Sequence, residues 1–332
     1  LTQTSFPSTG SMTGADTLGY YGVRIGDAAN AAGSQPTVSA GGNGNITITG
    51  TSGISTINYG TYVEGGTIAT ANGTISITGT ASSDAGTKTA VSIGVVLSGQ
   101  TTTTLGSSIT SSGGGAISIV GSSGANTFSG TGNGSSEGVR IGQSTVDTTG
   151  GTITISGTTN GLGNITVAAT GGGSAQYLHN GVAFARPATG YNQLYPTGST
   201  TTSIGASASA VTVNGYTGSA TNASGISWFK FLGTTFGGSN CTANFTFNAD
   251  RMLAYYVYGT TSGNFYVDTS GSVSVHSVNS DFASGDVIST TATYSPALMI
   301  SPRVSSLEIT PTTATSSRAI AVQQDTVMNS AN

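Results

Sequence analysis

The chain has very few charged side chains for its length. Of 332 residues, 8 are Lys or Arg and 12 are Asp or Glu, so 6% are charged, against about 25% in an average soluble protein. No basic cluster supplies the positive field that nucleic-acid binding requires, and we expect no nucleic-acid partner. Because few like charges oppose contact between copies, the composition favours a homo-oligomer or polymer.

Cysteine, histidine and long apolar runs are also scarce. The lone Cys241 cannot form an intrachain disulfide, and we expect it to pack as a small apolar residue. His179, expected in a loop, and His276, expected in a strand, are too few and too dispersed to form a zinc site with it. No run of 18 apolar residues is present, so the sequence predicts no membrane span.

The abundant feature is a pair of repeated phrases, one of the Gly-Val-x-Ile type and one of the Ile-x-Ile-x-Gly type. The first type occurs as Gly22-Val23-Arg24-Ile25, Gly60-Thr61-Tyr62-Val63, Gly94-Val95-Val96-Leu97 and Gly138-Val139-Arg140-Ile141. The second type occurs as Ile46-Thr47-Ile48-Thr49-Gly50, Ile75-Ser76-Ile77-Thr78-Gly79, Ile117-Ser118-Ile119-Val120-Gly121 and Ile153-Thr154-Ile155-Ser156-Gly157. Self-similarity of this kind predicts stacked structural units.

Each phrase alternates apolar and small polar residues, which indicates a strand with one buried face. Successive phrases start about 20 residues apart, so we predict a right-handed parallel β-solenoid over residues 1–194 with one phrase per coil. Glycine pairs before the Ile-containing strands are expected to supply positive φ at the corners. The predicted core residues are Val23, Ile25, Ile46, Ile48, Ile75, Ile77, Ile117, Ile119, Ile141, Ile153 and Ile155.

The second half has a different composition. Most of the aromatic residues lie here, in short alternating stretches such as Trp228 to Leu232 and Phe245 to Phe247. Separated by Gly, Ser, Asn and Asp, these stretches predict an antiparallel β-sandwich over residues 195–332. The overall expectation is therefore an all-β protein of two parts.

The first half resembles a known family. The stretch Tyr21-Gly22-Val23-Arg24-Ile25, the following Gly-Gly and Asn45 to Thr51 are similar to the repeats of filamentous-haemagglutinin-like and autotransporter-type bacterial surface adhesins. The resemblance covers Tyr20 to about Pro187. It implies a long right-handed β-helix that is secreted to the cell surface or beyond. The start at Leu1 without a signal peptide fits a processed, mature product, and a truncated piece would look the same.

Residues that could carry chemistry are few. Glu64 and Glu137 lie beside Gly-Val-x-Ile phrases, but we expect them to be solvated corner residues and assign no catalytic, cofactor-binding or metal-binding residue. Outward Thr and Ser residues, including Thr47, Thr49 and Thr166, would form hydroxyl columns on one flat face. Tyr59 and Tyr62 could stack on sugars, although core packing is the simpler expectation.

The sequence therefore predicts a non-enzymatic, extracellular structural subunit or adhesin that assembles into a fibre, sheath or surface layer. Alternation around Ile320 and Val322 suggests a C-terminal strand that enters a neighbouring subunit. The alternative is a monomeric domain that binds surface glycans or a receptor.

Overall fold

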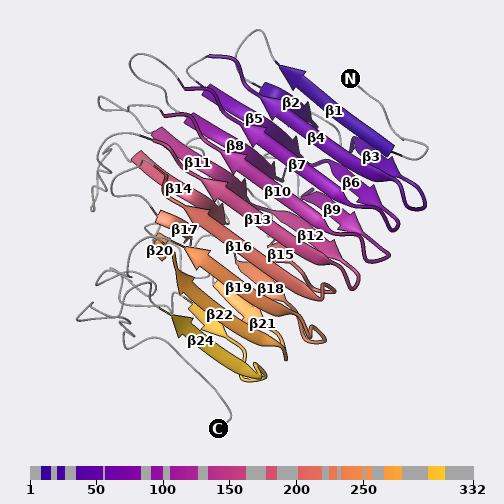
Figure 1. The fold of residues 1–332 in the computed structure, drawn as a ribbon, viewed down its shortest axis with the longest axis vertical. Helices are drawn as coiled ribbons and strands as arrows, with labels where there is room; N and C mark the ends of the chain where they lie inside the picture. The colour runs from indigo at the N-terminus through magenta and orange to yellow at the C-terminus, as the bar shows by residue number, and fades with distance from the viewer. Residues whose placement is uncertain are drawn as a thin grey trace.

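The computed structural model describes residues 9–15, 21–26, 35–54, 57–83, 91–99, 105–125, 134–161, 177–184, 201–218, 224–229, 233–249, 252–255, 265–278 and 298–310. Throughout these ranges the chain forms β-strands in three parallel sheets, and no helix occurs among the described residues. Each turn of the chain passes through the sheets in the same order, which makes a β-solenoid with β1 and β24 at opposite ends (Figure 1). The all-β solenoid prediction is confirmed at this level.

The three sheets are called A, B and C, and the chain passes through them in the repeating order B, C, A. Sheet B consists of β1 (Thr9–Ala15), β4 (Asn45–Thr51), β7 (Ile75–Thr80), β10 (Ile117–Ser122), β13 (Thr152–Thr158), β16 (Ala210–Tyr216), β19 (Asn244–Ala249), β22 (Ser272–Ser277) and β24 (Ser306–Thr310). Sheet C consists of β2 (Tyr21–Ile25), β5 (Ile57–Glu64), β8 (Val91–Ser98), β11 (Gly134–Ile141), β14 (Tyr177–Phe184), β17 (Ser224–Phe229) and β20 (Met252–Tyr255). Sheet A consists of β3 (Thr37–Ala40), β6 (Thr67–Thr70), β9 (Ser107–Ser111), β12 (Ser144–Thr148), β15 (Thr202–Ile204), β18 (Thr234–Gly237), β21 (Phe265–Asp268) and β23 (Leu298–Ile300).

One coil holds both phrases, and it is longer than the expected 20 residues. Ile46 pairs with Ile75, 29 residues later, and Ile75 pairs with Ile117, 42 residues later. The Ile-x-Ile-x-Gly phrases are the strands of sheet B, and the Gly-Val-x-Ile phrases are strands of sheet C. The two phrases of a repeat therefore lie on neighbouring sides of the same coil.

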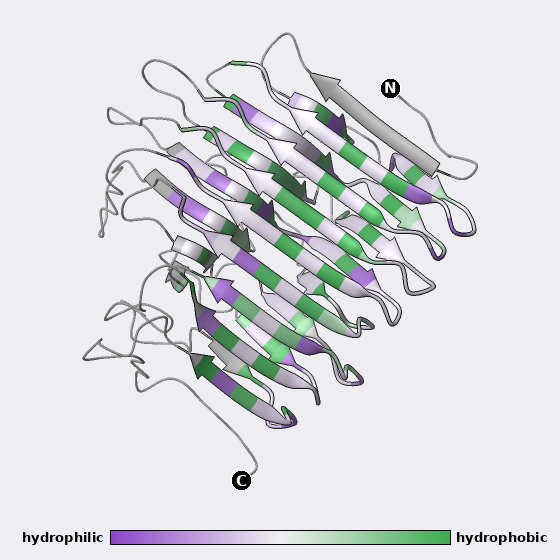
Figure 2. Ribbon diagram, in the orientation of Figure 1, coloured by the Kyte–Doolittle hydropathy of each residue, from purple (hydrophilic) through white to green (hydrophobic). Residues whose placement is uncertain are grey.

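Apolar residues stack in register inside the coil. Ile46, Ile75, Ile117 and Ile153 form one column of sheet B, and Figure 2 shows such columns as aligned green bands. The core residues expected from the phrases all lie in this buried cluster. Their Thr and Ser neighbours in sheet B face outward and are only partly buried.

The structure does not show the antiparallel sandwich predicted for residues 195–332. The described strands of this half pair in parallel and continue the same three sheets; β16, for example, follows β13 with Val211 beside Ile153. Larger side chains fill the same interior, with Phe236 and Phe265 in contact at 4.9 Å between ring centroids. Period-two alternation is common to parallel and antiparallel strands, so neither it nor the aromatic content distinguishes a sandwich from a continued solenoid.

Glycine columns explain why sheets B and C come so close. Gly79 of β7 and Gly94 of β8 face each other, and a Cβ on either would lie closer than 3.0 Å to backbone atoms of the other sheet. The glycine that ends each Ile-x-Ile-x-Gly phrase and the glycine that begins each Gly-Val-x-Ile phrase take part in this contact. Only a residue without a Cβ allows two backbones to approach in this way.

The predicted corner glycines have the expected conformation. In the pairs Gly41-Gly42, Gly65-Gly66, Gly114-Gly115 and Gly150-Gly151, one member has positive φ, between 56° and 92°. The corners from sheet A to sheet B are uniformly short, as between Thr70 and Ile75. Corners from sheet B to sheet C vary more, and the one after Thr158 reaches to Tyr177.

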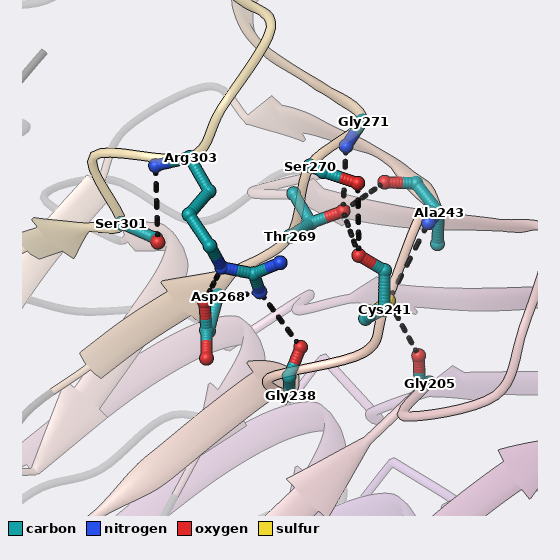
Figure 3. A network of polar contacts seen from close by, with 10 residues as sticks. All are labelled: Gly205, Gly238, Cys241, Ala243, Asp268, Thr269, Ser270, Gly271, Ser301 and Arg303. Carbon is teal, nitrogen blue, oxygen red and sulfur yellow. Dashed lines mark hydrogen bonds and ion pairs between the residues drawn. The ribbon is translucent and has the colours of Figure 1, made fainter. Parts of the chain in front are cut away.

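Successive A-to-B corners are hydrogen-bonded to one another in the C-terminal half (Figure 3). The Thr269 hydroxyl donates to the carbonyl oxygen of Ala243 at 2.7 Å, and the Cys241 thiol contacts the carbonyl oxygen of Gly205 at 3.4 Å. Cys241 is a buried free thiol within the core, as expected from its isolation in the sequence.

Candidate functional site

The outer face of sheet C carries a cluster of polar and aromatic side chains. We call Tyr21, Arg24, Tyr59, Tyr62, Glu64, Glu137 and Arg140 the Tyr–Arg band. Most strands of sheets A and B have partly exposed outer faces, but in β5 and β8 every residue after the first is buried. The band is therefore part of a second, smaller core beside the main one.

Strand register brings the band together. Tyr21 pairs with Tyr59 and Arg24 pairs with Tyr62 across β2 and β5. Tyr62 and Arg140 flank the same residue of β8, Val96. Residues more than 100 positions apart in the chain thus occupy one column.

At the β2 end of the band, Arg24 joins the aromatic rings to a carboxylate. Its guanidinium lies 3.1 Å from Glu64 Oε2, 5.0 Å from the ring centroid of Tyr21 and 5.8 Å from that of Tyr62. Tyr21 stacks on Tyr59 with 5.3 Å between ring centroids. Cation–π contact and ion pairing act on the same guanidinium, which accounts for its fixed position.

Glu137 and Arg140 form a fully buried ion pair. Arg140 Nε donates to Glu137 Oε2 at 2.6 Å, and Arg140 Nη2 donates to Ser135 Oγ at 2.8 Å. Burial disfavours the charged guanidinium, but the Glu137 carboxylate outweighs it and holds the pKa of Arg140 above its usual value. Asn180 Nδ2 reaches the other carboxylate oxygen of Glu137 at 3.5 Å.

Tyr62, at the centre of the band, is held neutral. Burial, and then the nearby Glu64 carboxylate, raise the pKa of Tyr62 well above its usual value. The buried, neutral phenol of Tyr62 lies near a carboxylate that is ion-paired with Arg24. This phenol can pack and form hydrogen bonds, but it does not act as a base near neutral pH. The core-packing interpretation of Tyr59 and Tyr62 fits their burial at 6% and 3% exposure.

The expectation that Glu64 and Glu137 are solvated corner residues is wrong. Both are buried, with 2% and 0% exposure, and each is paired with an arginine. Sequence reasoning missed Arg24 and Arg140 as their partners. The signal that could have identified them is the variable position of Gly-Val-x-Ile, which Arg24 and Arg140 occupy. This position lies between two inward residues, so its side chain points to the outer face of sheet C, where Glu64 and Glu137 also lie.

His179 was expected in a loop but lies in β14, within a second polar column at the junction of sheets B and C. This column contains Asn58, Ser92, Ser136 and His179. The Ser136 hydroxyl lies 2.6 Å from that of Ser123, and Ser92 Oγ accepts a hydrogen bond from the amide of Gly124. Burial lowers the pKa of His179 to about 4, against a smaller opposing effect of Glu137.

This buried histidine predicts acid sensitivity. The unfolded chain binds the His179 proton near pH 6.5 and the folded chain near pH 4. Between these values the unfolded state holds more protons, so stability falls as the pH falls. The contribution reaches about 3 kcal/mol at pH 4 relative to pH 7. Denaturant unfolding at both pH values should show a smaller pH dependence for His179→Gln than for the native chain.

His276→Gln is the matched control, because His276 lies on the outer face of sheet B. The two variants differ from the native chain only in one histidine each, so the contributions of all other groups cancel in the comparison. If His179→Gln and His276→Gln retain the same pH dependence as the native chain, His179 does not contribute to acid sensitivity.

The outer face of sheet B is a second candidate surface. Thr47, Ser76, Ser118, Thr154, Thr212, Thr246 and Ser274 form an unbroken column of hydroxyl residues. The hydroxyl face predicted from Thr47 and Thr49 is present, and Thr166 lies outside the described residues. Val120, 41% exposed, interrupts the neighbouring column.

Beyond Val120, the interrupted column becomes a hydrogen-bonded ladder. Asn214 Nδ2 donates to Ser156 Oγ at 3.0 Å, Asn248 Nδ2 donates to Asn214 Oδ1 at 2.8 Å, and His276 Nδ1 lies 3.1 Å from Asn248 Oδ1. Since Asn248 Oδ1 only accepts, His276 Nδ1 is the donor in this contact. Such ladders stabilise stacked parallel strands.

Within the described residues, no three His, Cys, Asp or Glu side chains gather as a metal site would require. No helix of the described structure is long and apolar enough to cross a membrane. No family model, curated protein or solved structure matches the chain. The surfaces of the solenoid and its edge strands are therefore the features that bear on function.

Proposed function

We propose that this protein is an extracellular structural subunit or adhesin that works by assembling with copies of itself. The observation that carries the proposal is the edge that sheet B presents at β24 in the described part of the chain. Leu307 and Ile309 continue the inward columns of Val273 and Val275, which are 0% exposed, yet both are only partly buried. Apolar core that is left uncovered at the end of a solenoid favours contact with another strand.

Composition and resemblance support the same proposal. The chain has a net charge of −4 over 332 residues, so electrostatic repulsion between copies is weak. The resemblance of Tyr20 to about Pro187 to surface-adhesin repeats favours a secreted location. Ile320 and Val322, which the sequence favours as an exchanged strand, lie outside the described residues.

Negative-stain electron microscopy of the purified protein, with sedimentation at several concentrations, tests this function. Ordered filaments or sheets that grow with concentration are expected. Dispersed single particles at all concentrations would favour the alternative, a monomeric domain that binds glycans through the hydroxyl and amide columns of sheet B.

A catalytic role for the buried carboxylates is the third possibility, and we expect it to fail. Glu137→Gln and Glu64→Gln should leave any activity in a polysaccharide-degradation screen unchanged, because each carboxylate is buried against an arginine. Turnover that disappears in either variant would assign the protein to the enzymes. Unfolding measurements on the same variants show whether a loss reflects misfolding.

A further inference from the structure

Sheet B presents two open edges in the part of the chain that the structure describes, β1 at one end and β24 at the other. All eight pairings between these edges are parallel and keep one register. A single column therefore begins at Thr13, passes through Thr49 and His276, and ends at Thr310. In the neighbouring register row, Met12 of β1 pairs with Ile48, and the row ends at Ile309 of β24.

We propose that copies of this protein stack head to tail, with β24 of one copy pairing in parallel with β1 of the next. The inference rests on the proposed function and specifies the contact between neighbouring subunits, the pairing of β24 with β1, which we call the joint. In the register of the sheet, Thr310 would lie beside Thr13 of the second copy, and Ile309 beside Met12. The uncovered core at Leu307 and Ile309 would then be closed by another coil of the same kind.

Charge favours this pairing over a symmetric one. Two β24 strands pairing antiparallel about their centre would place Glu308 opposite Glu308, and like charges directly opposite are destabilising. In the head-to-tail register, Glu308 instead lies beside Ser11, and β1 contains no charged residue.

The turn before β24 is already ordered for such a contact. Arg303 Nη2 lies 2.6 Å from Asp268 Oδ1 and 3.0 Å from the carbonyl oxygen of Gly238, so one side chain ties three coils together (Figure 3). The amide of Arg303 also donates to Ser301 Oγ at 3.3 Å. A preorganised edge lowers the entropic cost of adding the next strand.

The joint has a defined symmetry consequence. Pairing of β24 with β1 uses two different surfaces, so the contact is heterologous. Because each copy would add along the stacking direction of the coils, the assembly would stay open. The product is a polar filament in which every subunit points the same way. Its core and hydrogen-bond ladder would continue from one subunit to the next.

Cysteine pairing tests the register directly. Adjacent parallel strands are about 4.8 Å apart, which lies within the Cα separation of a disulfide or a short thiol cross-linker. A mixture of Thr13→Cys and Thr310→Cys proteins should give a covalent dimer, whereas either variant alone should not. The native Cys241 is buried at 2% exposure and does not compete. Thr49→Cys mixed with Thr310→Cys is the matched control: it should give no covalent dimer, because Thr49 lies one strand further from the edge than Thr13.

Two further variants separate this joint from other modes of assembly. Ile309→Asp should abolish filaments while circular dichroism shows a folded chain, because Ile309 is only partly buried. Deleting residues 318–332 should leave filaments intact, whereas strand exchange through Ile320 and Val322 predicts their loss.

The outcomes distinguish the joint from the function. Filaments without the Thr13–Thr310 cross-link, or filaments lost on deleting residues 318–332, would overturn head-to-tail stacking and leave assembly in place. A dimer from Thr310→Cys alone would indicate the symmetric contact. Protein that stays dispersed at every concentration would remove both proposals.

Discussion

Gly94→Ala is expected to destabilise the solenoid severely, by about 3 kcal/mol or more. A Cβ at Gly94 would lie closer than 3.0 Å to backbone atoms of Ser122, Gly121 and Gly138. Backbone on two neighbouring strands cannot move aside without breaking the parallel ladders on both sides of it. Denaturant unfolding followed by circular dichroism should show the loss as a lower midpoint, or as failure to fold.

Gly41→Ala is the control for this prediction. Gly41 has nothing within 4 Å of its would-be Cβ, and the positive φ at its corner belongs to Gly42. Ala also restricts the unfolded chain, so the change at Gly41 should be neutral or slightly stabilising. Equal midpoints for Gly94→Ala and Gly41→Ala would show that the sheets can separate, and the glycine columns would lose their explanation.

Ile48→Asp and Ile155→Asp should each cost several kcal/mol, because each places an unpaired carboxylate in the stacked core. Both isoleucines are 0% exposed and lie in one inward column of sheet B. The carboxylate would meet aliphatic side chains above and below. The free energy of unfolding, measured by urea titration, is the readout.

The adjacent outward positions provide the comparison. Thr49→Asp and Thr154→Asp put the same charge on the partly exposed face, where water solvates it. Their effect should be below about 1 kcal/mol. If the inward and outward sets unfold at the same midpoint, the assignment of the two faces is wrong.

The fold class was predictable from local pattern because alternation is a direct consequence of burying one face of a strand. The inward isoleucines and the positive-φ glycines followed from that pattern. The length of the coil did not, because two phrases of similar appearance lie on different sheets of one coil. Only pairing between distant strands, such as Ile75 beside Ile117, reveals which phrases are equivalent.

The second half was harder to predict for a related reason. Alternation of Phe245 and Phe247 suits either face-to-face sheets or a continued coil, and the sequence carries no mark of strand direction. In the structure, Phe247 occupies the column of Ile48 and has the smaller Val213 and Val275 as its neighbours. Volume is thus balanced between adjacent coils, and such compensation becomes visible only when the register is known.

The Tyr–Arg band was missed because its residues are unremarkable singly. Arg24 and Glu64 are 40 positions apart, and nothing local links them. Stacking brings them together, and burial then makes pairing obligatory for Glu64. The outward side of sheet C could be assigned from the phrases, but its coverage could not, since the sequence does not indicate which outer faces are buried.

The unequal corners have a consequence for how such a chain can change over evolutionary time. The turns from sheet A to sheet B are short and hydrogen-bonded to their neighbours, so an insertion there would disturb several coils. Corners from sheet B to sheet C already range from the short step between Ala249 and Met252 to the long one between Thr158 and Tyr177. Added residues at those corners leave every ladder in place, because closing a longer loop costs little free energy. Diversity among descendants, and peptides grafted by design, should therefore accumulate at corners of this kind and not at the turns from sheet A to sheet B.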